Sequence, residues 1–442
     1  MRYVLNPLAI ATLLAMAPAA TAAGLPSPDG AYAVGTTHVQ FVDRARTLDR
    51  RDVASGPRAV PAVVWYPARE DTRTDAAPTY LAGPALATTL PAIARNFGYS
   101  PNDLHALATV RVDVHPAAPP AHSPQGFPVV VFSHGFFLYP SQNTALAMHL
   151  ASHGYIVVSI AHPGDAADIG LDDGRVAATR VGVEGDDPRL AQAMQVLANG
   201  ADPQPLREAL STYADALPAT RIGRSFADWR DDTLAVAQQL RDGRSPEALH
   251  DVLAGADLGR LAFVGMSFGG ATAATSCRLV AVCRAAVNLD GQNFDPALYD
   301  GPVDRPLLLM LSDWTRYGLL AGQSRDADFS PNDLAYARWR DAARDSDVVR
   351  VRLQGARHLG FTDLVALLDG PEREARVGEL DGDAALSAIG DLVLTFLDAH
   401  VRDGEVADID RAIGRHPALV PHVPTRLRSW TTPVRAATPD PP

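Results

Sequence analysis

Short apolar runs rich in Val, Ile and Leu recur along this chain, each bounded by Gly, Pro or Asp, which is typical of β-strands. The later runs are apolar at consecutive rather than alternate positions, which predicts strands that are covered on both faces of a sheet. The predicted strands are Val60–Tyr66, Val129–Ser133, Ile156–Ile160, Leu261–Gly265, Ala285–Leu289, Leu307–Leu311 and Val348–Leu353.

Helical patterns alternate with these strands, at Asn143–His153, Phe226–Arg241 and Ala384–Val401. Alternating strands and helices predict an α/β fold with a mostly parallel sheet and helices on both faces. We therefore expect one catalytic domain over residues 24–401. Beyond Val401 the periodicity fades, which predicts a C-terminal extension over 402–442, with its end (Thr438–Pro442) disordered.

Two insertions interrupt the alternation. Residues 69–123 are rich in Ala, Pro and Thr, with one expected helix at Pro84–Phe97. Residues 165–225 are acidic and alanine-rich, with helical stretches near Pro188–Leu197 and Leu206–Leu217. A connection of that length is rarely bare loop, so the second insertion predicts a helical cap over the active site, or alternatively a surface decoration.

The N-terminus has the pattern of an export signal over residues 1–23. Arg2 provides the positive charge, Leu8–Ala17 the apolar run, and Ala20-Thr21-Ala22 the small residues before a cleavage site. The apolar run is shorter than the roughly 20 residues of a membrane span, which predicts a periplasmic or extracellular protein without a transmembrane anchor. The alternative is an apolar N-terminal helix of a cytosolic protein.

Charge and cysteine content narrow the class further. The formal net charge of −12 and the pI of about 5.5 argue against a nucleic-acid partner, whose phosphates would be repelled. The two cysteines, Cys277 and Cys283, could form a disulfide in an oxidising compartment or remain as two buried thiols. Oligomeric state leaves no mark in the sequence.

The strongest chemical motif is Gly265-Met266-Ser267-Phe268-Gly269. A predicted strand leads into it and an alanine-rich helix leaves it, which is the context of a nucleophile elbow. Glycines two residues before and after the serine avoid a collision at this sharp turn. We therefore predict that Ser267 is a catalytic nucleophile.

A serine hydroxyl needs a base, and the base needs an acid that orients it. Of the histidines after Ser267, His358 directly follows a late strand, so we predict that it is the base. Two acids end suitable strands: Asp290 follows Ala285–Leu289, and Asp313 follows Leu307–Leu311. The pattern alone leaves this choice open.

An oxyanion hole needs two backbone N–H donors, one of them just after the nucleophile. We assign these donors to Phe268 and, in the loop after Val129–Ser133, to Phe136. His134 in that loop and His162 after Ile156–Ile160 are expected to have structural roles.

The segments Phe132-Ser133-His134-Gly135, Gly265-Met266-Ser267-Phe268-Gly269-Gly270 and Asn288-Leu289-Asp290-Gly291 resemble the plasma or secreted platelet-activating-factor acetylhydrolase family and its dienelactone-hydrolase-like bacterial members. The resemblance covers about Val129–His162 and Phe226–Val401. It implies an α/β-hydrolase fold, an acid after the strand next to the elbow, and therefore Asp290 rather than Asp313. It also implies hydrolysis of short-chain or phospholipid acyl esters without a metal or organic cofactor.

The sequence therefore predicts an exported serine ester hydrolase that acts on a small-molecule or lipid ester through an acyl-enzyme. One alternative keeps the site and changes the substrate to a polyester, xenobiotic or other non-lipid ester. An alternative of another class is a catalytically silent binding protein on a hydrolase scaffold.

Overall fold

The computed structural model describes residues 24–49, 52–70, 77–100, 102–180, 187–199, 203–300, 305–318, 348–368, 370 and 373–423. The predicted export signal (1–23) and the predicted disordered end (Thr438–Pro442) lie outside these ranges, so both stay predictions.

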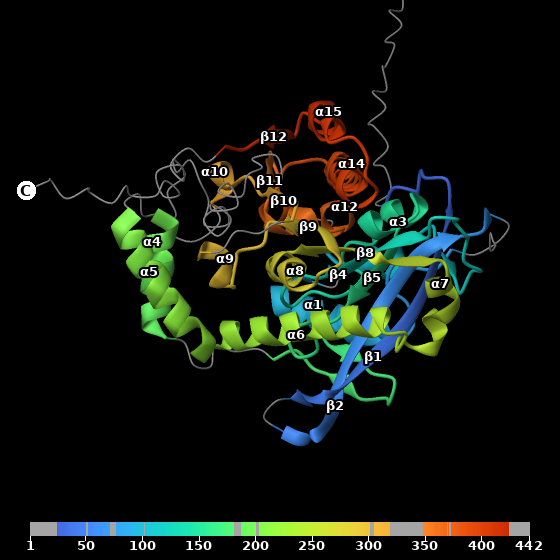
Figure 1. The fold of residues 1–442 in the computed structure, drawn as a ribbon, viewed down its shortest axis with the longest axis horizontal. Helices are drawn as coiled ribbons and strands as arrows, with labels where there is room; N and C mark the ends of the chain where they lie inside the picture. The colour runs from blue at the N-terminus through green and yellow to red at the C-terminus, as the bar shows by residue number, and fades with distance from the viewer. Residues whose placement is uncertain are drawn as a thin grey trace, which may run out of the picture.

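A ten-stranded sheet forms the centre of the molecule, in the order β12-β11-β10-β9-β8-β4-β5-β2-β1-β3 (Figure 1). Its middle strands pair in parallel, as β1 does with β3, whereas β2 pairs antiparallel with β1 and β5, and β12 pairs antiparallel with β11. All seven predicted strands are present, so the α/β prediction is confirmed. The strands are β1 Ala33–Asp49, β2 Asp52–Ala68, β3 His115–Pro116, β4 Phe127–Ser133, β5 Ile156–Ile160, β8 Ala256–Met266, β9 Cys283–Leu289, β10 Leu307–Leu311, β11 Val348–Leu353 and β12 Leu419–Pro421.

Helices cover both faces of this sheet, which explains why its strands are apolar at consecutive positions. Helices α3 (Thr144–Ser152) and α14 (Gly382–Val401) lie on one face, and α6 (Arg221–Arg241) and α8 (Phe268–Leu279) lie on the other (Figure 1). In β4, alternate residues enter the two cores: Val130 and Phe132 pack on the α3 side, and Val129 and Val131 pack on the α6 side.

Strand β1 was not predicted from the sequence. It pairs antiparallel with β2 along a long two-stranded ribbon, and polar residues such as Thr37, His38 and Gln40 interrupt its apolar positions. Thr37 and Gln40 are only partly buried and His38 is exposed, because this part of the sheet is not fully covered. The apolar run that marks a buried strand is therefore absent.

The two predicted insertions are built from short elements. The first contains α1 (Gly83–Phe97), as expected, together with α2 (His105–Thr109) and β3, which pairs with β1. The second contains the paired strands β6 and β7, the adjoining helices α4 and α5, and the start of α6. Their bounds are β6 Ile169–Gly170, β7 Val176–Ala177, α4 Pro188–Asn199 and α5 Pro203–Ala216.

Helix α6 begins five residues earlier than predicted. Thr220 is its N-cap, and its hydroxyl accepts a hydrogen bond from the N–H of Gly223. Helix α5 touches the segment that follows β9, since the hydroxyl of Tyr213 donates to the carbonyl of Asn293 at 3.0 Å. Whether the pair of α4 and α5 acts as a cap stays a prediction. The remaining helices are α7 His250–Ala254, α9 Ala297–Asp300, α10 Trp314–Tyr317, α12 Leu364–Leu367, α13 Arg373–Val377 and α15 Ala407–Arg415, with 3-10 turns at Leu217–Ala219, Glu247–Leu249 and His358–Phe361.

The segment after Val401, which the sequence predicts to be a C-terminal extension, contains two further elements. Helix α15 packs on α14, and β12 extends the sheet by pairing antiparallel with β11. The apolar stripe of α15 consists of only Ile409, Ala412 and Ile413, and β12 is three residues long. Both apolar patterns are too short to be recognised in a polar stretch of sequence. The helix and the strand are stabilised by packing against the rest of the core.

Within the described residues, one helix, α14, is long and apolar enough to cross a membrane. Of its most apolar stretch, 61% is buried inside the protein, against α3 and strands β8 and β9. Its apolar surface is therefore used by the core.

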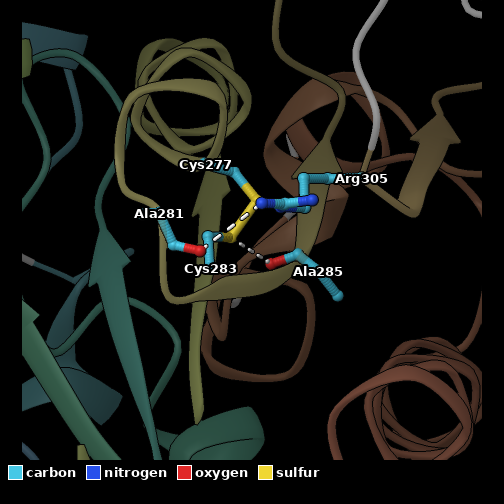
Figure 2. The surroundings of a disulfide bond; sticks show 5 residues. All are labelled: Cys277, Ala281, Cys283, Ala285 and Arg305. Atoms are coloured by element: carbon cyan, nitrogen blue, oxygen red, sulfur yellow. Dashed lines mark hydrogen bonds between the residues drawn. A yellow bond between two sulfur atoms is a disulfide. The ribbon is translucent and has the colours of Figure 1, made fainter. Parts of the chain in front are cut away.

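A disulfide joins Cys277, near the end of α8, to Cys283, at the start of β9 (Figure 2). It closes the short turn between the two elements. The guanidinium of Arg305 lies beside this turn and donates to the carbonyl of Ala281 at 3.4 Å. Of the two alternatives for these cysteines, the structure contains the disulfide.

Candidate active site

Ser267 lies at the sharp turn between β8 and α8. Its backbone has φ 56° and ψ −122°, a conformation that costs a non-glycine residue about 1–3 kcal/mol. The turn is tight because a Cβ atom on Gly265 would come within 2.2 Å of the Gly269 backbone, and one on Gly269 within 2.0 Å of the Ser133 carbonyl. The structure therefore has the nucleophile elbow that the motif predicts.

His358 and Asp290 complete a hydrogen-bonded chain with Ser267. The Ser267 hydroxyl lies 2.8 Å from Nε2 of His358, and Nδ1 of His358 lies 2.7 Å from Oδ2 of Asp290. A carboxylate only accepts, so Nδ1 donates to Asp290, and Nε2 is left to accept from Ser267. The His358 side chain is 40% exposed, whereas that of Asp290 is buried. His358 is thus reachable from solvent, and Asp290 is shielded from it.

Asp313, the other candidate acid, has a different set of partners. Its Oδ2 accepts from the N–H of Gly355 at 3.0 Å, and its Oδ1 accepts from the Thr315 hydroxyl at 2.9 Å. Asp290 is held by the N–H of Ser312, which donates to its Oδ1 at 2.9 Å. The structure therefore brings Asp290 to the histidine and uses Asp313 to brace the loop that carries it.

In the loop after β4, the backbone N–H groups on either side of Phe136 have protein acceptors, whereas that of Phe136 has none within the described part of the chain. The N–H of Gly135 donates to Oε1 of Gln142 at 2.8 Å, and the N–H of Phe137 donates to the carbonyl of Asp165 at 2.7 Å. Among the described residues, no protein acceptor faces the N–H of Phe136 or that of Phe268. Both predicted oxyanion donors are thus left for a ligand oxygen.

A fully buried polar network supports this loop from behind. Nδ1 of His134 donates to the carbonyl of Gly135 at 2.7 Å, while its Nε2 accepts from the N–H of His162 at 3.2 Å. This pairing fixes one neutral tautomer of His134. Burial, with a smaller contribution from the neighbouring His162, lowers the pKa of His134 to about 3, which agrees with that tautomer.

The same network continues through His162 to a buried ion pair. Nδ1 of His162 donates to Asp232 at 3.1 Å, and Arg58 donates to both oxygens of that carboxylate, at 3.0 and 2.6 Å. Burial opposes the charge of Asp232, but the Arg58 guanidinium and the His162 hydrogen bond hold its pKa well below the usual range. Trp229 stacks on His162 with ring centres 3.9 Å apart.

His134 and His162 therefore have the structural roles expected of them. Arg58 and Asp232 carry no sequence signal, because neither belongs to a motif: Arg58 lies in β2, and Asp232 is one of several acids in α6.

A second buried carboxylate, Asp363, links the loop of His358 to the start of α3. It accepts from the N–H groups of Thr144 and Ala145, at 2.5 and 3.2 Å, and from the hydroxyl of Tyr80 at 3.0 Å. Burial raises the pKa of Asp363 to about 8, with the three donors acting against that rise. Asp363, too, has no sequence signal, because its partners lie far away in the chain.

Aromatic side chains surround the loop after β4 that carries Phe136, which we call the oxyanion loop. The ring of Phe268 lies 5.0 Å from that of Phe136 and 4.8 Å from that of Phe294. Phe226 and Trp229, both from α6, pack against the same group. Helix α6 thus provides an apolar wall beside the two N–H donors.

Among the described residues, one group has the composition of a metal site. Asp29, His149 and His153 place their ligand atoms within 4.8 Å of one another. Asp29 accepts from Nδ1 of His149 at 2.9 Å, so a hydrogen bond already accounts for this contact. None of the three belongs to the chain of Ser267, His358 and Asp290.

The family comparison matches the N-terminal third of the protein. Residues 18–172 fit the model of platelet-activating factor acetylhydrolase, isoform II. The sequence resembles that family. The matched range includes the loop of Phe136, so it supports the resemblance over Val129–His162. It ends before Ser267 and therefore includes none of Ser267, Asp290 and His358.

The fold comparison covers most of the protein. A ferulic acid esterase from Streptomyces cinnamoneus superimposes with a TM-score of 0.64 at 22% sequence identity, over 90% of this chain and 99% of that one. At this identity the match establishes the fold, which is that of an α/β hydrolase. Together, the family model and this fold support a hydrolase of carboxylic esters.

Proposed function

We propose that the protein is an exported serine esterase that hydrolyses short-chain or phospholipid acyl esters through an acyl-enzyme. The observation that carries the proposal is the hydrogen-bonded chain from Ser267 through His358 to Asp290. The family resemblance supports the lipid part of the proposal, and the disulfide between Cys277 and Cys283 supports export to an oxidising compartment.

In the first step, Oγ of Ser267 attacks the ester carbonyl carbon while Nε2 of His358 takes the hydroxyl proton. The carbonyl oxygen becomes an oxyanion, which the N–H groups of Phe136 and Phe268 stabilise. Each such donor contributes on the order of 100- to 1,000-fold in kcat. Asp290 holds His358 in the required tautomer and stabilises its positive charge.

The intermediate then collapses as the bond from the carbonyl carbon to the alcohol oxygen breaks. Nε2 of His358 returns its proton to that oxygen, so the alcohol leaves in neutral form and an acyl ester remains on Ser267. In the second step His358 takes a proton from water, and the resulting hydroxide attacks the acyl carbon. The acid departs, and Ser267 regains its proton.

The direct test is Ser267→Ala, with Ser276→Ala as the matched control. Ser276 lies in the same helix, and its buried hydroxyl has no hydrogen-bond partner among the described residues. Hydrolysis of a para-nitrophenyl acetate should be lost in Ser267→Ala and kept in Ser276→Ala. A fluorophosphonate probe should label the wild type and the control alone. Equal labelling of all three proteins would overturn the proposal.

Hydrolysis rates across acyl chains from acetyl to long acyl, on phospholipid and simple alcohol backbones, test the substrate class. The proposal expects the rates to fall as the acyl chain lengthens. Export is tested separately, by N-terminal sequencing of protein recovered from the periplasm or medium of a producing cell. A mature chain that begins near Gly24 supports it, and a full-length chain retained in the cytosol contradicts it.

A further inference from the structure

A cavity of about 280 Å³ lies beside His358. It is bounded by the residues after β10, by the end of α10, by the loop that carries His358 and by α13. Two arginines and a tyrosine line it: Arg357, Arg376 and Tyr317. Its position beside the base makes it available to part of a bound ester.

Arg357 is the unusual member of this lining. Its guanidinium lies over the ring of Tyr317, with Cζ 4.1 Å from the ring centre. Among the described residues it has no carboxylate partner, and its Nε atom is buried without a hydrogen-bond acceptor. A buried N–H donor without an acceptor, such as Nε of Arg357, is costly unless an acceptor reaches it.

The other charged groups around the cavity have partners. Asp313 accepts from Gly355 and Thr315, and Arg352 lies 3.6 Å from its Oδ1. Arg316 is paired with Glu379. Arg376 interacts electrostatically with the carboxylate of Asp103, and its guanidinium also lies over the ring of Tyr99, 5.2 Å from its centre. Arg357 is therefore the cation of this cavity whose charge the described protein groups leave unpaired.

The chemistry of the proposed reaction decides which part of an ester meets this cavity. His358 donates its proton to the departing alcohol oxygen. The alcohol part of the ester must therefore lie on the His358 side of the reacting carbon. Arg357 directly precedes His358 in the chain, and both line the same cavity. The acyl part is placed instead by Ser267 and the oxyanion donors.

We propose that Arg357 binds an anionic group on the alcohol part of the substrate, either a phosphate or a carboxylate. This inference rests on the proposed esterase function and deepens it. A guanidinium forms paired hydrogen bonds with the oxygens of both groups. In a protein whose net charge is −12, an unpaired cation at this point is what draws an anionic ester to the base.

The test compares kcat/KM for three acetate esters with similar alcohols. These are the acetates of para-hydroxybenzoate, of its neutral methyl ester, and of para-hydroxyphenyl phosphate. The proteins are the wild type, Arg357→Gln, Arg357→Lys and the matched control Arg316→Gln. Arg316 lies near the same tyrosine ring but is already paired with Glu379.

The measured quantity is the ratio of kcat/KM for each anionic ester to that for the neutral ester. Arg357→Gln should lower at least one of the two ratios on the order of 10- to 100-fold, because a charge-assisted hydrogen bond is lost. Arg357→Lys should restore part of the loss, and Arg316→Gln should keep the wild-type ratios. Raising the ionic strength should weaken the preference of the wild type.

The two anionic esters distinguish which anionic group Arg357 binds. A fall in the ratio of the phosphate ester alone indicates an alcohol that carries a phosphate, and a fall in the ratio of the carboxylate ester alone indicates an alcohol that carries a carboxylate. Unchanged ratios in Arg357→Gln, or an equal loss in Arg316→Gln, would overturn the inference. Neither result would touch the proposed function, whose failure would appear as turnover by Ser267→Ala.

Discussion

The Nε2 atom of His162 lies 3.2 Å from the hydroxyl of Ser133, and both side chains are buried. Since Nδ1 of His162 donates to Asp232, these residues form a second chain of serine, histidine and aspartate. Unlike the chain of Ser267, it has no access to solvent. Ser133 directly precedes the loop that carries Phe136, the predicted oxyanion donor, so this second chain positions that loop.

Asp232 should be essential for stability, because its loss leaves Arg58 buried without a counter-charge. Asp232→Asn is expected to lower the free energy of unfolding by about 3–5 kcal/mol in urea denaturation. In the Asp232→Asn protein that remains folded, kcat should fall by a larger factor than KM changes, because the oxyanion loop is held less firmly. Asp173→Asn is the control, because that exposed acid pairs with Arg175 at the surface, and the unfolding curve should barely move.

The acid of the triad can be identified by exchanging each candidate carboxylate for an amide. Asp290→Asn should lower kcat by roughly 1,000- to 10,000-fold, because an amide at this position favours the wrong tautomer of His358. Asp313→Asn should have a much smaller effect, since it loosens the loop at Gly355 without touching the imidazole. Similar losses in both variants would contradict the assignment.

Acid should destabilise the protein through His134. Burial lowers the pKa of His134 to about 3, so in the folded state it stays neutral where the unfolded chain binds a proton. Its contribution to stability is therefore present above about pH 6.5 and is lost as the pH falls toward 3, with a slope of up to about 1.4 kcal/mol per pH unit. Unfolding curves between pH 7 and pH 4 measure this slope.

Asp363 acts in the opposite direction, because its raised pKa of about 8 makes stability fall as the pH rises from about 4 to 8. The contribution of His134 is therefore isolated by comparing the wild type with His134→Gln, in which the slope below pH 6.5 should become less steep. The exposed His105 provides the control His105→Gln. An unchanged slope in His134→Gln would show that the histidine is not kept neutral by the fold.

The disulfide between Cys277 and Cys283 should make a measurable contribution to stability even though it closes a short loop. The double variant Cys277→Ala and Cys283→Ala is expected to lose about 2 kcal/mol of unfolding free energy, by the entropy of loop closure in the unfolded chain. A reductant should cause a similar loss in the wild type and none in the double variant. If reduction destabilises both proteins equally, the bond is not the cause.

The predictions that succeeded from the sequence rest on local patterns. The strand into Ser267 and the helix out of it, with glycines at 265 and 269, are encoded within a few residues, because the geometry of the elbow is itself local. The seven strands were likewise found, since strands covered on both faces are largely apolar; in β11 two arginines, Arg350 and Arg352, interrupt the apolar run. Strand β12 and helix α15 were missed because neither carries enough apolar surface of its own to mark it.

By itself, therefore, the sequence determined the α/β architecture, the strand-turn-helix around Ser267 and the position of His358 after a late strand. The residue pattern left open which carboxylate meets His358, since Asp290 and Asp313 both end strands. The family resemblance indicated Asp290, and only the tertiary structure placed that carboxylate against the imidazole. It alone also joined Arg58 and Asp232 to the oxyanion loop and left Arg357 unpaired beside the base. These relations depend on side chains far apart in the chain, and their distances exist only once the sheet has placed the ends of its strands together.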